Sequence, residues 1–187
     1  MDMEVLQKSA SDPVWDAEET KLVYTYPVDP KVALSGEKFC SGIPADELYR
    51  TDPFLCARSP QTHIGPFKWA VDFLVPDGSL VYAAQDGEVI EVSQNSTRWG
   101  DGEEFRDDLN YLTIQHRNGE CSQYCHLAAF SPRDLHAYPR RIVKQGQPIA
   151  RVGKSGWTDR DHLHFVVLRP DQSPQNPFGF KSLKVRF

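Results

Sequence analysis

Short apolar runs separated by turn sequences occupy most of the chain from Lys68 onward. Each run is 6 to 13 residues long, and the breaks between them are rich in Gly, Pro, Asp and Asn. The runs are KWAVDFLV (68–75), SLVYAA (79–84), EVIEVS (88–93), NYLTIQH (110–116), ECSQYCHLAAF (120–130), RIVKQGQPIARVG (141–153) and HLHFVVLR (162–169). This pattern is typical of antiparallel strands joined by tight turns, and no long segment follows the helical period of 3.6. The sequence therefore predicts a mainly β fold with antiparallel sheets.

The first sixty residues differ from the rest. Residues 1–20 are polar and lack apolar periodicity, so we expect a disordered or loosely docked leader. Residues 21–60 contain one candidate strand (21–28), a possible helical turn at DELYR (46–50) and many loop signals, and we expect an N-terminal arm. Residues 61–187 then form the main domain.

Composition narrows the possible partners. The chain has 187 residues, of which 40% are hydrophobic and 25% charged, as in one soluble globular domain. Its net charge of −5 and its scattered basic residues argue against nucleic acid, and no apolar run is long enough for a membrane span. No signal peptide is visible, so we expect a periplasmic or extracellular location if a leader was removed, or else another route to the substrate such as host lysis or a dedicated secretion system.

Four cysteines permit disulfides without requiring them. A Cys40–Cys56 bridge and free thiols are both open. If residues 121–127 form a strand, Cys121 and Cys125 lie about 13 Å apart, which is too far for a bridge.

Two histidines mark the last apolar run as a candidate site. In a strand, His162 and His164 project from one face, while Leu163 and Phe165 project from the other, apolar face. Two imidazoles on one face can share a metal site, one as a ligand and the other acting on water. A polar outer face that happens to contain histidines is the simpler alternative.

Three further residues carry possible chemistry. In YCHL, strand alternation puts Tyr124 and His126 on one face, although a lone histidine is usually structural. Asp72 lies within an apolar strand, where a carboxylate must be hydrogen bonded, paired or bound to a metal. His63 precedes this strand in THIGPF and could reach the same site or remain exposed.

The order of these motifs resembles the lysostaphin-type, or LytM-like, zinc metallopeptidases with a duplicated hybrid motif β core. The resemblance spans about residues 62–168 and rests on His63 and Asp72 together with several ordered family motifs. Those motifs are "PxGxxVxAxxxGxV" as PDGSLVYAAQDGEV, "GNxVxIxHxxG" as LNYLTIQHRNG, "YxHL" as YCHL, "VxxGQxIxxxGxSG" as VKQGQPIARVGKSG, and HLHF.

The resemblance implies one zinc ion on His63, Asp72 and His164, with His126 and His162 as catalytic groups beside the attacking water. It also suggests substrate contacts from Asn110, whose alternative is a turn residue, and we consider Tyr124 a further candidate. The first family histidine usually stands four residues before the aspartate, where this chain has Lys68, so His63 departs from the common spacing.

The implied function is hydrolysis of cross-links or stem peptides in bacterial peptidoglycan. The alternative is an inactive or autoinhibited LytM-like module that binds the cell wall or a regulatory protein partner, with the arm covering the groove.

Overall fold

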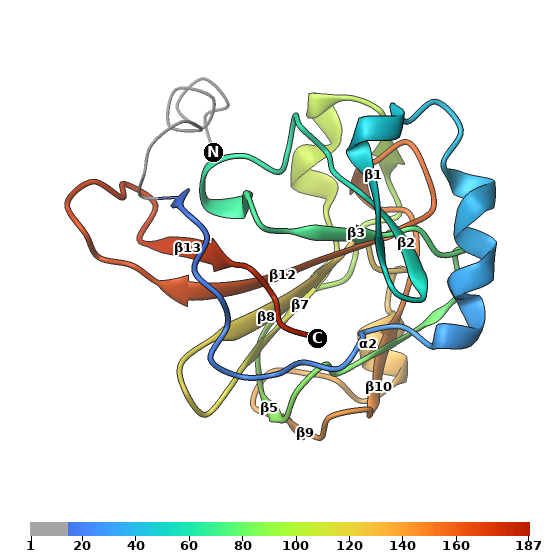
Figure 1. The fold of residues 1–187 in the computed structure, drawn as a ribbon. Helices are drawn as coiled ribbons and strands as arrows, with labels where there is room; N and C mark the ends of the chain where they lie inside the picture. The colour runs from blue at the N-terminus through green and yellow to red at the C-terminus, as the bar shows by residue number, and fades with distance from the viewer. Residues whose placement is uncertain (1–14) are drawn as a thin grey trace.

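The computed structural model describes residues 15–187 as one large antiparallel sheet with smaller elements around it (Figure 1). Its strands follow the order β1-β2-β3-β12-β8-β7-β5-β9, and β13 also pairs with β12. Their bounds are β1 Leu48–Thr51, β2 Phe54–Ala57, β3 Val71–Phe73, β5 Gly87–Ser93, β7 Tyr111–Gln115, β8 Cys121–Cys125, β9 Ile142–Val143, β12 Leu163–Pro170 and β13 Phe180–Leu183. This architecture confirms the predicted mainly β fold class.

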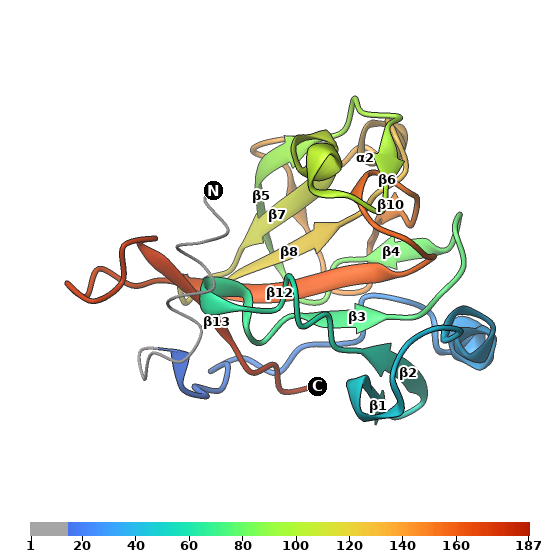
Figure 2. The same ribbon diagram turned by 90° about the horizontal axis from the view of Figure 1, so that it is seen from above.

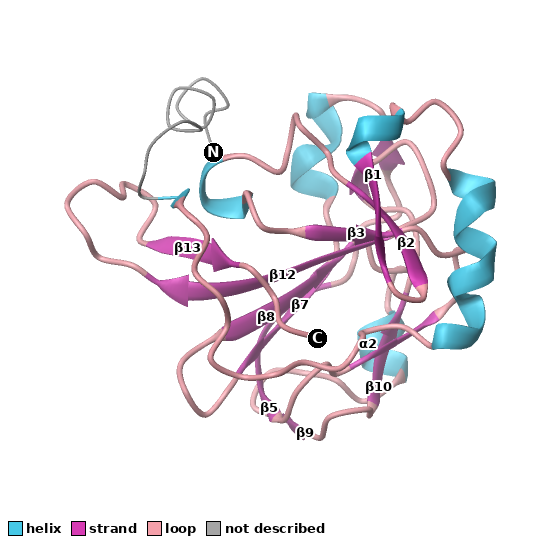
Figure 3. Ribbon diagram, viewed as in Figure 1, coloured by secondary structure: helices cyan, strands magenta, loops and turns pink. Residues whose placement is uncertain are grey.

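Two strand pairs and several short helices complete the fold. β4 (Leu80–Tyr82) pairs with β10 (Pro148–Arg151), and β6 (Trp99–Gly100) pairs with β11 (Gly156–Trp157). The helices lie at the periphery of the sheet (Figure 3): α2 is Ser131–Asp134, and the 3-10 helices are η2 Pro30–Phe39, η3 Ala45–Glu47, η4 Gly65–Phe67 and η5 Glu103–Asp108. Within residues 15–187, no helix is long and apolar enough to cross a membrane.

One face of the large sheet carries the core. Phe165 of β12 and Leu112 of β7 are fully buried and belong to the same apolar cluster as Val81 of β4 and Ile149 of β10. Aromatic rings extend this core toward the chain ends, with centroids 4.8 to 6.3 Å apart among Tyr26, Phe54, Phe73, Phe165 and Phe187. Strands β3, β12 and β8 lie side by side (Figure 2), and their opposite face carries the candidate site residues described below.

The arm is partly sheet. Its hairpin β1–β2 extends the large sheet because β2 pairs with β3. The expected helical turn near residue 46 is present as η3, which leads directly into β1. The predicted strand over residues 21–28 is wrong: Tyr24 N–H donates to the carbonyl of Arg186 and Thr25 N–H to that of Ala84, and only Val28 forms a bridge. The segment changes partner along its length, so no ladder forms.

The described part of the predicted leader is packed against the C-terminal segment. Trp15 is 2% exposed, its ring centroid lies 6.0 Å from that of Phe178, and Glu19 forms a bridge with Lys184. The rest of that leader, residues 1–14, lies outside the described residues. All four cysteines are free thiols, so the Cys40–Cys56 bridge is absent.

Candidate active site

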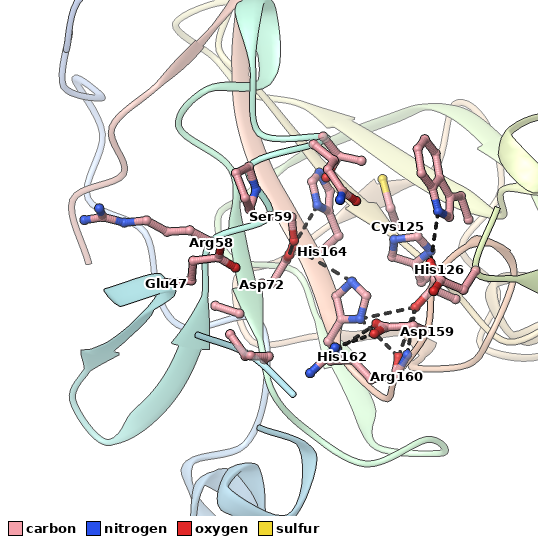
Figure 4. A pocket seen from close by; sticks show the side chains of 18 of the residues that line it. Glu47, Arg58, Ser59, Asp72, Cys125, His126, Asp159, Arg160, His162 and His164 are labelled. Atoms are coloured by element: carbon pink, nitrogen blue, oxygen red, sulfur yellow. Dashed lines mark hydrogen bonds and ion pairs between the residues drawn. The ribbon is translucent and has the colours of Figure 1, made fainter. Parts of the chain in front are cut away.

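Three side chains meet where β3 pairs with β12. Asp72 and His164 are direct partners in the register of these strands, so strand geometry alone brings them together (Figure 4). His63 arrives from the turn before η4. Its Nε2 lies 3.1 Å from Asp72 Oδ1 and 3.3 Å from His164 Nδ1, and the Asp72 and His164 atoms are 2.8 Å apart.

This triangle has the size of a metal site. Zinc bonds of about 2.0–2.1 Å in a tetrahedral arrangement separate ligand atoms by roughly 3.3 Å, which is close to the observed separations. Two imidazole nitrogens and one carboxylate oxygen are also the donors of catalytic rather than structural zinc sites. His63, Asp72 and His164 form the one such group found within residues 15–187 that could hold a metal ion.

The charges at the site suit a cation. Burial alone would raise the pKa of Asp72, but the imidazoles of His63, His162 and His164 hold it well below its usual value. Burial also lowers the pKa of His164, although Asp72 opposes that shift. An ionised carboxylate and a neutral imidazole are the protonation states that metal binding requires.

Two more histidines flank the triangle. His126 Nδ1 lies 2.8 Å from the carbonyl oxygen of Ser155, and His162 Nδ1 lies 3.1 Å from that of Arg160. A carbonyl oxygen only accepts, so each Nδ1 carries the proton and donates it, which leaves each neutral ring with a lone pair on Nε2. His162 Nε2 is 3.9 Å from Asp72 Oδ1, and the His126 and His162 ring centroids are 4.6 Å apart.

His126 is the more deeply shielded of the pair. Burial, reinforced by the neighbouring His162 and His164, lowers its pKa to about 3. The His126 ring is therefore neutral at physiological pH and can accept a hydrogen bond at Nε2.

The backbone places His126 in the site by breaking strand alternation. Tyr124 points into the core, where it is 0% exposed and its hydroxyl accepts a hydrogen bond from Ala84 N–H. β8 ends at Cys125, and His126 has a φ of 59°, a left-handed conformation that turns its ring toward the groove. The predicted common face of Tyr124 and His126 is wrong, and Tyr124, the candidate for a substrate contact, is not among the residues that line the groove.

Asn110, the other candidate for a substrate contact, lies inside the protein. It is 0% exposed, its side-chain oxygen accepts from Ser96 N–H, and its amide donates to the carbonyls of Ser96 and Leu127. Every side-chain polar atom is used in joining two loops, and Asn110 is not among the residues that line the groove.

A groove of ≈ 670 Å³ leads to these residues. The arm contributes Ile43, Glu47 and Arg58 to one wall, whereas Trp157 and Arg160 belong to the other. The guanidinium of Arg160 donates to the carbonyls of Phe39 and Ser41, which fastens the arm to the loop before β12. The arm therefore lines the groove without adding a ligand to the His63, Asp72 and His164 group.

Sequence reasoning missed the groups that orient the histidines. The carbonyls of Ser155 and Arg160 fix the tautomers of His126 and His162, but a backbone acceptor has no side-chain signature. The GKSG run that contains Ser155 was the one available signal.

A family comparison decides what kind of site this is. The model of peptidase family M23 matches residues 66–177, which is more than half of the chain and includes Asp72, His126, His162 and His164. The chain belongs to peptidase family M23. This membership confirms the resemblance to lysostaphin-type zinc metallopeptidases. His63 lies just before the matched M23 region, so its place in the site rests on geometry.

Curated relatives of this M23 chain include bacterial cell-wall enzymes. Peptidoglycan DD-endopeptidase ShyB of Vibrio cholerae is 34% identical over 97 residues, which are 52% of this chain and 19% of that protein. DD-carboxypeptidase/endopeptidase Mpg of Neisseria meningitidis is 30% identical over 127 residues, which are 68% of this chain and 26% of that protein. The aligned part of the chain thus spans about a fifth to a quarter of these relatives.

Among solved structures, a zinc containing peptidase from Vibrio cholerae is 26% identical with a TM-score of 0.47. The match covers 78% of this chain and 36% of that one.

Proposed function

We propose that this chain is a zinc-dependent endopeptidase that hydrolyses cross-links or stem peptides of bacterial peptidoglycan. One observation carries the proposal: His63, Asp72 and His164 place three donor atoms within 3.3 Å of one another, beside two histidines with fixed tautomers. Membership in family M23 supports it, as do one relative named as a peptidoglycan DD-endopeptidase and one named as a DD-carboxypeptidase/endopeptidase.

His63 Nε2, Asp72 Oδ1 and His164 Nδ1 would hold one zinc ion per chain and leave a position open toward the groove. When bound, zinc polarises a peptide carbonyl and lowers the pKa of water. Three protein ligands with an open position are the usual arrangement for this chemistry.

The flanking histidines then divide the proton transfers. His162 Nε2 carries a lone pair and lies 3.9 Å from Asp72 Oδ1, beside the proposed metal position, so we assign His162 as general base. The proton that it takes from the attacking water would pass to the leaving amine. His126, which is neutral and donates its Nδ1 proton to the carbonyl of Ser155, would orient the water from the other side by accepting a hydrogen bond at Nε2.

The substrate would lie between the arm and the loop that carries Trp157 and Arg160, because these elements form the two walls of the groove. Peptidoglycan lies outside the cytoplasmic membrane, so we propose a periplasmic or extracellular site of action.

Digestion of purified peptidoglycan tests this function. Mass spectrometry of the soluble products should show newly freed peptide ends and fewer cross-linked fragments, and a chelator should abolish them until zinc is restored. His162→Ala provides a matched control that keeps the three ligands. A zinc-loaded protein that sediments with peptidoglycan but yields no new peptide ends would contradict the proposal and favour a binding module.

A further inference from the structure

Ser59, a half-buried serine, forms hydrogen bonds with two of the three proposed metal ligands, Asp72 and His63. Ser59 lies just after β2, in the segment that leads to His63, and it lines the groove. Its hydroxyl donates a hydrogen bond of 2.5 Å to Asp72 Oδ2. Its carbonyl accepts from the N–H groups of Thr62 at 2.9 Å and of His63 at 2.6 Å.

The two oxygens of Asp72 therefore have separate partners. Oδ1 faces His63 and His164, while Oδ2 is taken by the hydroxyl of Ser59. Asp72 is only 3% exposed, so water has little access to replace a missing partner of Oδ2. This division favours a carboxylate that offers a single oxygen to a cation.

The backbone of Ser59 acts on the other ligand. Because its carbonyl accepts from both Thr62 and His63, the segment closes into a tight turn that ends at the histidine. His63 stands nine residues before Asp72 in the chain. Two residues nine positions apart do not lie on one strand here, so strand geometry cannot bring His63 to Asp72. The turn closed by Ser59 therefore has to bring His63 to Asp72.

We infer that Ser59 is a positioning residue of the metal site, which orients Asp72 through its hydroxyl and His63 through its carbonyl. This inference rests on the proposed function, since it assumes a metal ion at that site. Hydrogen-bonded partners of metal ligands typically contribute about 10- to 100-fold to metal affinity.

The test measures zinc affinity rather than peptide cleavage. Metal-free parent protein and the variants Ser59→Ala and Ser59→Thr are titrated with zinc in competition with a chromogenic chelator. Ser59→Ala should bind zinc about 10- to 100-fold more weakly, whereas Ser59→Thr, which keeps a hydroxyl, should stay close to the parent. Ser93→Ala, a serine of β5 outside the groove lining, serves as the matched control.

Cobalt(II) in place of zinc gives a second readout. In Ser59→Ala the freed Oδ2 can swing toward the metal, and a higher coordination number weakens the visible absorption bands of tetrahedral cobalt. A purely structural serine would leave that spectrum unchanged once the site is filled.

The outcomes separate the two levels of the account. If the parent binds no zinc, the proposed function fails. If the parent binds zinc and Ser59→Ala binds it equally well with the same cobalt spectrum, the positioning role of the Ser59 hydroxyl is refuted. An equal loss of affinity in Ser59→Ala and Ser59→Thr, with circular dichroism like that of the parent, would refute the role of the hydroxyl.

Discussion

Replacing His63 by alanine challenges the ligand whose position the sequence predicted least well. The substitution removes the donor atom that lies 3.1 Å from Asp72 Oδ1 and 3.3 Å from His164 Nδ1. Two donors remain, and the buried carboxylate of Asp72 loses one of its partners. We expect the variant to lose most of its zinc.

The size of the loss follows from the energy of zinc binding. Four-ligand zinc sites in small domains are worth about 10–16 kcal/mol, which is roughly 2.5–4 kcal/mol for each ligand. Losing one ligand should thus weaken zinc binding by about 100- to 1,000-fold, since each 1.4 kcal/mol corresponds to roughly a factor of ten.

Competition titration against a chelator measures this change. Two matched controls should bind zinc like the parent: Lys68→Ala, at the position where the family usually has its histidine, and His136→Asn, an exposed histidine outside the site. The side chain of Lys68 lies over the Trp69 ring, with Nζ 5.5 Å from the ring centroid. Parent-like affinity in His63→Ala, or a large loss in Lys68→Ala, would refute the ligand assignment.

Three further predictions concern the neighbouring residues. His126→Ala and His162→Ala should each retain zinc near one equivalent but cleave peptidoglycan about 10²- to 10⁴-fold more slowly in product assays, and loss of zinc from both would contradict their separate role. The folded pKa of His126 is about 3, whereas the ordinary pKa of a histidine is 6.5, so the unfolded chain binds more protons between these values. The metal-free protein should therefore lose stability as the pH falls through that window, on the order of 2 kcal/mol between pH 7 and pH 5. Urea unfolding measures this loss, and the free energy of unfolding should depend more steeply on pH in the parent than in His126→Gln. Asn110→Ala should lower the free energy of unfolding by roughly 2–3 kcal/mol, because the Ser96 N–H and two carbonyls lose their partner. A changed KM at parent-like stability would argue for substrate contact instead.

The strand pattern predicted the fold class and the faces of the site residues that lie on the regular strands β3 and β12. Leu163 and Phe165 are buried as their alternation indicates, and His164 pairs with Asp72 across β12 and β3. In these regular strands, side-chain direction follows from residue number, so a periodic pattern is sufficient.

Prediction failed where the backbone leaves the regular pattern. The positive φ of His126 reverses the face that alternation assigns to it, and no sequence period encodes such a conformation. The segment around Tyr24 has an apolar strand pattern, yet its hydrogen-bond partners lie at the C-terminus and beside β4 rather than in one neighbouring strand.

Family resemblance and geometry contributed different things. The common motifs assigned Asp72, His126, His162 and His164 at their usual spacing, whereas His63 was assigned despite a departure from that spacing, and its position depends on a turn closed by Ser59. The hydrogen bonds that close this turn are local, but its approach to Asp72 involves the tertiary contact of the Ser59 hydroxyl, which a single sequence does not reveal.

Anomalous X-ray diffraction at the zinc edge, on crystals of the zinc-loaded protein, tests the central claim most directly. The account predicts one strong peak within about 2.0–2.2 Å of His63 Nε2, Asp72 Oδ1 and His164 Nδ1. A peak coordinated by other side chains, or no peak at this position in a zinc-saturated crystal, would contradict it.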